Sequence, residues 1–378
     1  MRTTARWLVD RLSGAGYAVT VFDLATASSD PYSRRLAAPP TWFRKSLVST
    51  DSLERQVRHV GANAVEVEPF RYLPRPELSE LLNQFDLVQV IAGGPALALA
   101  AMGLRPPVVL QVASTVAWER SSRTVSRSPL GLWRRTMSVI TSRLEDRALR
   151  GTTKILVLNR QMRNYVWSQT TVPVELLATG IDVDRFTPAA HGWNPRGYAL
   201  SLCRLDDPRK GLDRLIQSYA CALASRPDAP DLILAGRGPL PRILAGLIVD
   251  LGVADRVTVR LDVTDSELPD LYRGASVFLQ TSYEEGLGLS VLEAMACGLP
   301  VVTTITAGTL ETVTDGESGW LVEQGPDLIA AAARRMLSVW DHQGFRMACA
   351  ARLRAVSTFS DDRVFARYVD IYGELLSK

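Results

Sequence analysis

The stretch Glu284-Glu-Gly-Leu-Gly-Leu-Ser-Val-Leu-Glu-Ala-Met-Ala-Cys-Gly298 decides the fold, together with the apolar run Ser276-Val-Phe-Leu-Gln-Thr281 that precedes it. The apolar run lies between glycines, which is typical of a buried strand. From Leu289 the apolar residues follow a helical period up to a Gly-Leu-Pro stop signal. The pattern therefore predicts a strand that ends near Glu285 and a following helix that carries Glu293 about one turn from its start.

Two glycines between these glutamates, Gly286 and Gly288, remove side chains where the backbone must approach something closely. The first amides of the helix point to the same place and favour an anion, typically phosphate. Glu285 and Glu293 can then accept hydroxyl groups on either side of that anion, which is the layout of a nucleotide sugar. The alternative is a glutamate that caps the helix and a second one on its solvated face.

Three further segments precede this stretch, namely Arg204…Lys210-Gly211, Leu234-Ala-Gly-Arg-Gly-Pro239 and Thr179-Gly-Ile-Asp-Val-Asp-Arg-Phe-Thr-Pro188. Together the four segments resemble the retaining glycosyltransferases of family 4, which have the GT-B fold. The resemblance is dense from about residue 154 to residue 322. It implies an α/β fold with two Rossmann-like, doubly wound parallel-sheet domains that face a cleft.

The resemblance also implies roles for the charged residues. Arg204 and Lys210 would clamp the diphosphate and act as catalytic residues with Glu285, which would contact hydroxyl groups of the donor sugar. Glu293 would bind the ribose diol. Because glycosyl transfer leaves new negative charge on a diphosphate, positive charge held at the diphosphate is the largest contribution that the protein can make to catalysis. The alternative for Arg204 and Lys210 is a solvated pair of charges on a loop.

The nucleotide would be bound largely by backbone. The resemblance assigns phosphate binding to amides near Leu289 and Ser290, and base binding to a loop around Val263. Gly236 and Gly238 follow an expected strand and would let the backbone approach the nucleotide. Because position 241 is a proline, the third glycine of a dinucleotide fingerprint is missing, which disfavours a nicotinamide enzyme.

A metal ion and a separate cofactor are not expected. Asp182-Val-Asp184 matches a metal-binding D-x-D pattern, but it lies at the expected end of the first domain, away from the phosphates that a hard cation would bridge. We interpret it as structural. The donor substrate would be a UDP-, GDP- or ADP-sugar.

The sequence departs from the family pattern in the first domain. Many members have a histidine just after the strand equivalent to 108–112, where this chain has Ala113-Ser-Thr115. Ser114, Thr115 and Glu119 are the remaining candidates for the acceptor side. His59 is expected on a surface helix and is given no role.

The domains are expected at 1–186 and 197–359, with a C-terminal helix at 360–378 that crosses back to the first domain. A helix is expected at 3–14, a long loop at 25–50, and further helices at 76–83, 96–102 and 129–149. The expected strands are 17–22, 64–68, 87–91, 108–112, 155–158 and 174–177 in the first domain, and 199–203, 232–235, 257–261, 277–280, 301–304 and 320–322 in the second.

Composition is that of a globular chain, with 47% hydrophobic and 22% charged residues among 378 and no apolar run of membrane-spanning length. Four scattered cysteines indicate neither a zinc site nor a disulfide framework, and they fit the cytoplasm. Residues 1–180 hold 23 Lys and Arg against 14 Asp and Glu, so the first half attracts anions more strongly. Helix 129–149 is interpreted as an ordinary packed helix; the alternative is a basic surface that docks on the inner face of a membrane. No nucleic-acid partner is expected.

The beginning of the chain carries a separate expectation. The resembling family has a buried strand and a glycine-rich loop before the helix at 3–14. A doubly wound sheet needs that central strand, because its absence would leave unpaired backbone on both neighbours. We therefore expect the reading frame to start upstream of Met1.

The leading hypothesis is a retaining, metal-independent glycosyltransferase that moves a sugar from a nucleotide diphosphate to a carbohydrate, a lipid-linked or a small-molecule acceptor. The alternatives are a catalytically silent GT-B partner subunit, which the missing histidine motivates, and a sugar-nucleotide epimerase.

Overall fold

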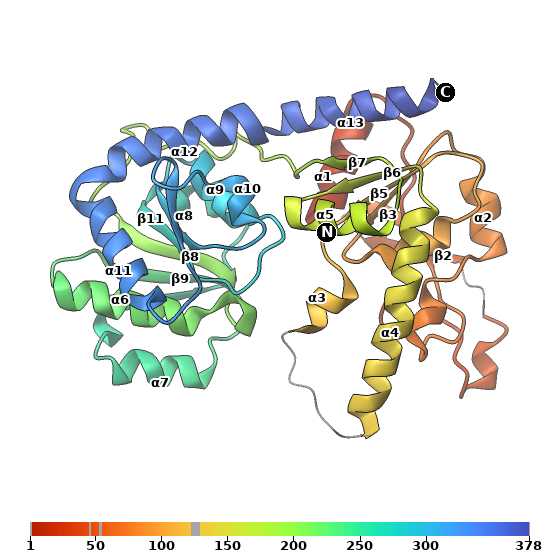
Figure 1. The fold of residues 1–378 in the computed structure, drawn as a ribbon, viewed down its shortest axis with the longest axis horizontal. Helices are drawn as coiled ribbons and strands as arrows, with labels where there is room; N and C mark the ends of the chain where they lie inside the picture. The colour runs from red at the N-terminus through yellow and green to blue at the C-terminus, as the bar shows by residue number, and fades with distance from the viewer. Residues whose placement is uncertain (1, 45–46, 53–54, 122–128, 378) are drawn as a thin grey trace. The chain divides into compact units, whose positions relative to one another are not determined.

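The computed structural model describes residues 2–44, 47–52, 55–121 and 129–377. The chain forms two compact units, one of residues 1–177 with 365–378 and the other of residues 178–364 (Figure 1). Residues 178–186, which we expected in the first domain, belong to the second unit. The amide of Ile181 donates to the Phe359 carbonyl at 2.8 Å, and the Arg352 guanidinium donates to the Phe186 carbonyl at 2.8 Å. These bonds fix the segment on α12 (Gly344–Phe359).

The second unit contains a six-stranded sheet in the order β10-β9-β8-β11-β12-β13, and all its ladders are parallel. Its strand order reverses between β8 and β11, which makes this pair the switch point where ligands bind in such sheets. The six strands that the sequence predicts here are confirmed. They are β8 (Tyr198–Arg204), β9 (Leu232–Arg237), β10 (Val257–Leu261), β11 (Ala275–Gln280), β12 (Val301–Thr304) and β13 (Gly319–Val322).

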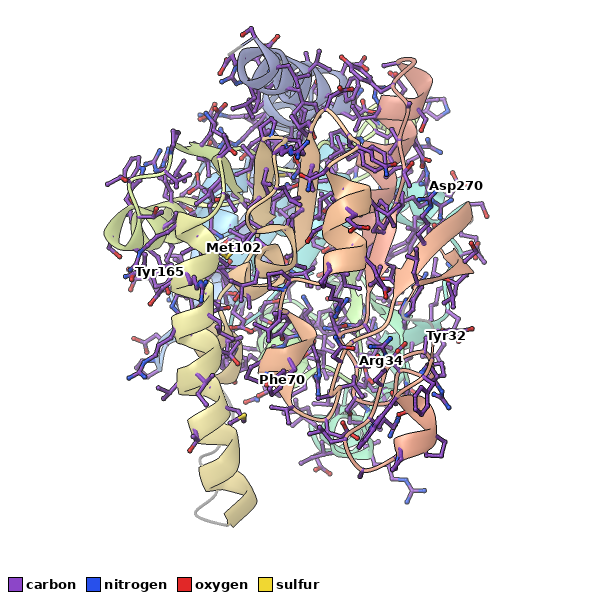
Figure 2. The ribbon with its side chains drawn as sticks, turned by 90° about the vertical axis from the view of Figure 1, so that its right-hand side faces the viewer. Tyr32, Arg34, Phe70, Met102, Tyr165 and Asp270 are labelled. Atoms are coloured by element: carbon purple, nitrogen blue, oxygen red, sulfur yellow. The ribbon has the colours of Figure 1, made fainter. Side chains whose placement is uncertain are left out.

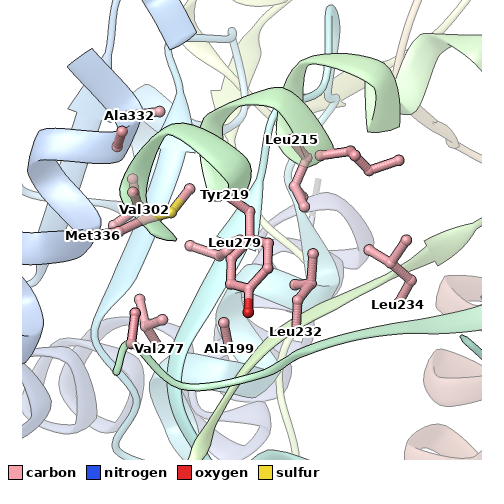
Figure 3. Packing of buried hydrophobic residues seen from close by; sticks show 14 of the residues in the cluster. Ala199, Leu215, Tyr219, Leu232, Leu234, Val277, Leu279, Val302, Ala332 and Met336 are labelled. Carbon is pink, nitrogen blue, oxygen red and sulfur yellow. The ribbon is translucent and has the colours of Figure 1, made fainter. Parts of the chain in front are cut away.

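Helices join these strands, as parallel pairing requires. Figure 3 shows Tyr219 of α6, a helix between β8 and β9 in the chain, lying over Ala199 and Leu232 in the core of the unit. The Tyr219 hydroxyl donates to the Pro230 carbonyl at 2.9 Å, so the buried ring keeps its polar tip satisfied. The helices are η4 (Pro208–Lys210), α6 (Leu212–Ser225), α7 (Arg242–Asp250), η5 (Ala254–Arg256), α8 (Leu268–Arg273), α9 (Leu289–Ala296), α10 (Thr309–Thr312), α11 (Leu328–Ser338) and the π-helix η6 (Val339–Gln343), followed by α12.

The first unit has two separate sheets. The larger is parallel, in the order β4 (Val88–Ala92), β5 (Val108–Val112), β6 (Lys154–Val157) and β7 (Val174–Leu176). The smaller has the order β1 (Phe22–Leu24), β3 (Arg55–Val60) and β2 (Leu47–Ser52), with β1 parallel and β2 antiparallel to β3.

The C-terminal helix α13 (Asp361–Leu376) contributes its residues from Phe365 onward to the first unit. The rings of Tyr368 and Trp7 meet edge to face at 5.8 Å, and the Tyr372 hydroxyl donates to the Gln89 side chain at 3.0 Å. The other helices of this unit are α1 (Arg2–Gly14), η1 (Pro39–Thr41), η2 (Glu68–Arg71), α2 (Pro76–Leu82), η3 (Pro95–Ala101), α3 (Val116–Ser121), α4 (Pro129–Arg150) and α5 (Arg160–Gln169). Among the described residues, none of the helices combines the length and the apolar character that crossing a membrane requires.

The sequence predictions are wrong in part of the first unit. The expected strand at 64–68 is a turn in which Ala64 has a φ of 53°, followed by η2. Its alternation reflects the burial of Val65, whose amide donates to the Arg34 carbonyl at 3.1 Å. Arg34 lies on the loop after β1 and is labelled in Figure 2. The expected loop at 25–50 includes the start of β2, and the expected helix at 96–102 is the 3₁₀ helix η3.

His59 was expected on a surface helix but lies in β3, with only 7% of its surface exposed. Its Nδ1 is 3.1 Å from Asp23 Oδ2, and its Nε2 is 3.0 Å from Asp30 Oδ1. Contacts with these two aspartates thus explain the position of a histidine that the local sequence pattern placed on a helix.

The strand expected at 17–22 begins only at Phe22, because the first residues of β3 pair with β2 alone.

Candidate active site

The carboxyl ends of β8 and β11 bring Lys210 and Glu285 together. Lys210 ends η4, and its Nζ lies 2.5 Å from Glu285 Oε1. The same carboxylate oxygen accepts hydrogen bonds from Gln280 Nε2 at 2.6 Å and Ser282 Oγ at 3.0 Å. Three donors on one oxygen hold the carboxylate in a fixed orientation, and both charged side chains remain partly exposed, at 20% and 13%.

Arg204 is the last residue of β8, and its guanidinium pairs with Asp207. Asp207 also accepts hydrogen bonds from the Arg209 amide at 3.1 Å and from its Nη2 at 2.9 Å, so it caps η4. Burial raises the pKa of Asp207, but the hydrogen bonds from Arg209 outweigh it, and the pKa lies below its ordinary value. Arg209 also reaches Glu284 at 3.1 Å. The Arg204 side chain is 60% exposed and therefore accessible to an anion.

Glycines allow the loops after β8, β9 and β11 to touch. A Cβ on Gly211, where φ is 60°, would lie 2.3 Å from the Thr281 carbonyl oxygen. A Cβ on Gly236 would lie 1.6 Å from the Cys203 carbonyl oxygen. A Cβ on Gly238, where φ is 82°, would lie 2.8 Å from the Asp206 carboxylate. Gly236 therefore serves the close packing of β9 on β8, and Gly238 that of the loops after these strands, roles that the sequence pattern did not indicate.

The N-cap of the helix α9 is Gly288, which has a φ of 84° and a ψ of 61°. Leu289 and Ser290 form its first turn and are partly exposed. In the part of the chain that the structure describes, no acceptor contacts the amides of these two residues. Because such amides carry the positive end of the helix dipole, they form a site for an anion. Gly286 precedes them on the partly exposed loop that also carries Glu285.

The loop between β12 and α10 packs against the glutamate loop, which is the segment between β11 and α9 that carries Glu285. The sequence reasoning missed this contact. The amide of Gly308 donates to the Glu285 carbonyl at 2.9 Å. A Cβ on Gly308 would lie 2.6 Å from the backbone nitrogen of Leu287. Thr306 and Thr309 join their hydroxyls at 2.9 Å and hold this loop closed. A glycine before a Thr-rich turn is too common a pattern to have indicated the contact.

Glu293 lies one turn into α9, where its Oε2 accepts a hydrogen bond from the Tyr272 hydroxyl at 2.8 Å. Burial raises the pKa of Glu293 to about 7, although the bond from Tyr272 and the positive charge of Arg185 oppose the rise. The structure thus gives Glu293 an environment quite unlike that of a solvated helix residue.

The loop after β10 carries Val263, which is half-buried.

Asp182 and Asp184 form part of a turn. Asp182 Oδ1 accepts the amides of Asp184 at 3.2 Å and Arg185 at 2.8 Å, which is a local capping pattern. Among the described residues, no group of three or more histidine, cysteine, aspartate or glutamate side chains could hold a metal ion.

In the first unit, Thr115 is buried, and its Oγ1 accepts the Trp118 amide at 3.2 Å at the start of α3. Ser114 is half-buried, and the side chain of Glu119 lies outside the described residues. Glu145 of α4 is fully buried and accepts the Val116 amide at 3.0 Å. A Cβ on Gly94 would lie 2.7 Å from its Oε1. Glu145 thus orders the loops that follow β4 and β5.

Two α/β units, each with a parallel sheet, and a basic pair with a helix N-terminus at the switch point of the second are the features of the GT-B fold. Residues 1–185 match the family Glycosyltransferase Family 4, and residues 186–354 match Glycosyl transferases group 1. The chain belongs to the family 4 glycosyltransferases.

Curated relatives are similar over part of the chain. A D-inositol 3-phosphate glycosyltransferase of Salinispora arenicola is 35% identical over 228 residues, which cover 54% of this chain and 50% of the relative. A GDP-mannose-dependent alpha-(1-6)-phosphatidylinositol monomannoside mannosyltransferase of Mycolicibacterium smegmatis is 36% identical over 173 residues, with 42% and 44% covered. The chain matches about half the length of these relatives or less.

Solved structures confirm the fold. Sucrose-phosphate synthase from Thermosynechococcus elongatus matches 99% of this chain and 92% of its own with a TM-score of 0.68 and 22% identity. Anabaena Alr3699/HepE, in complex with UDP-glucose, matches 79% of this chain and 81% of its own with a TM-score of 0.62 and 18% identity.

Proposed function

We propose that this protein is a retaining glycosyltransferase that uses a nucleotide-diphosphate sugar. The observation that carries the proposal is the contact of Lys210 with Glu285 at 2.5 Å, at the switch point of the second sheet and beside the open first turn of α9. Three kinds of group thus lie at one edge of one sheet. They are a carboxylate that can accept sugar hydroxyls, a cation that can pair with phosphate, and helix amides that can donate to phosphate. Each is the partner that one part of a nucleotide sugar requires.

In the proposed reaction, Arg204 and Lys210 bind the diphosphate and stabilise the negative charge that develops as the anomeric C–O bond breaks. Glu285 accepts hydrogen bonds from donor sugar hydroxyls and keeps Lys210 in place. The acceptor hydroxyl attacks from the face that the diphosphate leaves, which retains the anomeric configuration. The departing phosphate oxygen lies nearest to the incoming hydroxyl in this arrangement, so it takes the proton.

Glu293 is proposed to bind the ribose. Its carboxylate lies one turn along the same helix whose amides at Leu289 and Ser290 would bind phosphate. An ionised carboxylate accepts two hydroxyl donors at once, which suits a vicinal diol. Tyr272 already donates one hydrogen bond to Oε2, so that oxygen is oriented before the nucleotide arrives. The backbone near Gly236, Gly238 and Val263 would border the nucleotide.

The donor is proposed to be a UDP-, GDP- or ADP-sugar, and the acceptor a carbohydrate, lipid-linked or small-molecule hydroxyl. One relative is named for GDP-mannose and HepE was solved with UDP-glucose, so these two donors are tested first. The names of two relatives contain inositol, which makes an inositol phosphate the first acceptor to test. Two cations at the leaving group supply the charge that a metal would otherwise supply, so we propose a metal-independent reaction.

A panel of nucleotide sugars tests the proposal with the purified chain. Each donor is scored by the rise in the thermal unfolding midpoint, because a ligand that binds the folded state stabilises it by mass action. Slow release of free sugar is then measured without acceptor. We expect at least one donor to bind and to be hydrolysed. A catalytically silent subunit, the alternative that the absent first-domain histidine motivates, would hydrolyse none of them.

A further inference from the structure

The strand β10 forms one end of the six-stranded sheet in the second unit and pairs with β9. The amide of Asp262, just after the strand, donates to the Gly236 carbonyl of β9 at 2.9 Å. Because alternate residues of a strand direct their backbone groups to opposite edges, Val257, Val259 and Leu261 direct theirs away from β9. In the described part of the chain, no hydrogen-bond partner reaches the amides or carbonyls of these three residues. The outer edge of β10 is therefore open.

The open edge lacks the usual protection against a further strand. Edge strands in natural proteins commonly carry several charges, a proline or a bulge. The five residues of β10 are Val-Thr-Val-Arg-Leu, with one charge, and their ladder to β9 runs without a break in register. The guanidinium of Arg260 already donates to Glu267 of its own chain at 3.4 Å. The edge is thus a template for a strand of another chain.

Apolar side chains are exposed on β10 and on the helix before it. Val259 is 37% exposed and Leu261 is 53% exposed, while Val257 packs on the core cluster of the unit. The helix α7 exposes Ile243 and Val249, at 80% and 65%. Exposed apolar surface of this kind on two successive elements is typical of a protein interaction site.

The sequence of β10 is complementary to its own copy in one antiparallel register. When Val259 lies opposite Val259 of a second copy, Val257 lies opposite Leu261, so each apolar side chain meets an apolar side chain. These are also the three residues whose backbone groups point outward, so residues that lie opposite each other exchange both hydrogen bonds. The register therefore gives a partner both to the open backbone groups and to the exposed apolar side chains.

Charges select this register from its neighbours. Here Thr258 lies opposite Arg260, and Arg256, just before the strand, lies opposite Asp262 of the second copy. Opposite charges across strands are favourable, and like charges directly opposite each other are not. A register centred on Thr258 would put Arg256 opposite Arg260, and one centred on Arg260 would put the two copies of that arginine opposite each other. A register centred on either end of β10 would pair a single strand residue of each copy.

We propose that this chain forms a two-fold symmetric dimer in which β10 pairs antiparallel with β10 of a second copy, with Val259 at the axis. Such an interface uses the same patch on both copies and closes at two, because each copy has one β10 edge to offer. A strand of an unrelated protein could pair with the same edge, but its sequence would not need to mirror that of β10. The mirror order of apolar and charged residues therefore identifies a second copy as the occupant.

Antiparallel pairing also keeps the two active sites apart. All strands within one sheet are parallel, so the strands of the two joined sheets run in opposite directions. The carboxyl ends of β8 and β11, which bring Lys210 and Glu285 together, consequently lie at opposite edges of the joined sheet in the two copies. The dimer is thus compatible with an independent site in each copy, and its test does not require a donor.

Sedimentation velocity at protein concentrations from about 1 µM to about 100 µM tests the dimer, because association follows mass action. We expect the mass of the wild type to approach twice that of the monomer. Val259→Lys places two like charges opposite each other at the axis and should raise the dissociation constant at least roughly 100-fold. Val259→Pro removes the outward amide at a position where an edge strand tolerates proline, and it should have the same effect. The matched control, Val139→Lys, changes an exposed valine of α4 in the first unit and should associate like the wild type.

A wild type that stays monomeric over this range would overturn the proposal. A dimer that persists in both Val259 variants would also overturn it, because another surface would then form the dimer. Equal disruption by Val139→Lys would have the same meaning. Circular dichroism establishes that each variant is folded, and Val259→Lys alone carries the test if the proline variant does not fold.

A disulfide test fixes the register. Opposite residues of a hydrogen-bonded antiparallel pair have Cα atoms about 5.5 Å apart, which a disulfide can span. In a Cys349→Ser background, which removes an exposed cysteine, we expect mild oxidation with diamide to cross-link Val259→Cys into a reducible dimer. Thr258→Cys is the matched control, because its two copies lie opposite each other only in a shifted register. Cross-linking of Thr258→Cys in preference to Val259→Cys would contradict the proposed register and the charge argument with it.

Discussion

Glu293 should make the stability of the protein depend on pH in a direction opposite to that of most carboxylates. Burial raises its pKa from an ordinary 4.5 to about 7, so the folded state keeps a proton that the unfolded chain releases. The stabilising effect is complete below about pH 4.5 and is lost as the pH rises through 7. A difference of this size corresponds to about 3 kcal/mol of unfolding free energy.

The perturbation that tests this is Glu293→Gln, which removes the titration but keeps an oxygen that can accept the Tyr272 hydroxyl. Urea unfolding is measured at intervals between pH 4.5 and 8.5 for the wild type and the variant. We expect the variant to gain about 3 kcal/mol relative to the wild type across this range. Glu323→Gln, at an exposed position, is the matched control and should change little.

Parallel stability curves for the wild type and Glu293→Gln would refute the reasoning. They would mean that the carboxylate is solvated well enough to keep an ordinary pKa, and the buried contact with Tyr272 would then be wrong.

The remaining predictions concern the loops and the basic pair. Gly308→Ala should cost about 1–3 kcal/mol of stability by overpacking against Leu287, and it should lower donor turnover by shifting the glutamate loop. Denaturant unfolding and kinetics measure the two effects. The control Gly325→Ala, with nothing within 4 Å of its Cβ, should change neither stability nor turnover. An unchanged Gly308→Ala enzyme would show that the two loops move independently. Arg204→Ala and Lys210→Ala should each lower the donor hydrolysis rate by roughly 100-fold, while EDTA leaves the wild-type rate unchanged. A full loss of activity in EDTA would mean that a metal ion, and not the two basic side chains, stabilises the leaving diphosphate.

The second unit was largely predictable from the sequence because its strands are short apolar runs bounded by glycine and proline. In a parallel sheet the carboxyl ends of the strands meet at one edge, so Lys210 and Glu285 could be expected to lie close together although 75 residues separate them. The buried partners could not be predicted. Gln280 and Ser282 lie within five residues of Glu285, but nothing in that segment indicates that they donate to its carboxylate. Tyr272 reaches Glu293 through tertiary packing.

The first unit was harder because its local patterns conflict with its tertiary contacts. Val65 alternates with polar neighbours as in a strand, yet it is buried on a turn against the loop after β1. His59 looked like a helix surface residue, but two aspartates beside β3 hold it. Glu145 carries a charge and is nevertheless fully buried. In each case long-range partners decide the position, and a window of sequence does not contain them.

The measurement that tests the central claim most directly compares donor turnover with nucleotide affinity in two variants. Glu285→Gln weakens the charge-assisted bonds to donor hydroxyls, and Glu293→Ala removes the proposed ribose contact. The account predicts that Glu285→Gln loses turnover by roughly 100-fold but binds the free nucleotide like the wild type. Glu293→Ala should bind the nucleotide more weakly. Equal loss of nucleotide affinity in both variants, or a wild type that neither binds nor hydrolyses any donor of the panel, would contradict the account.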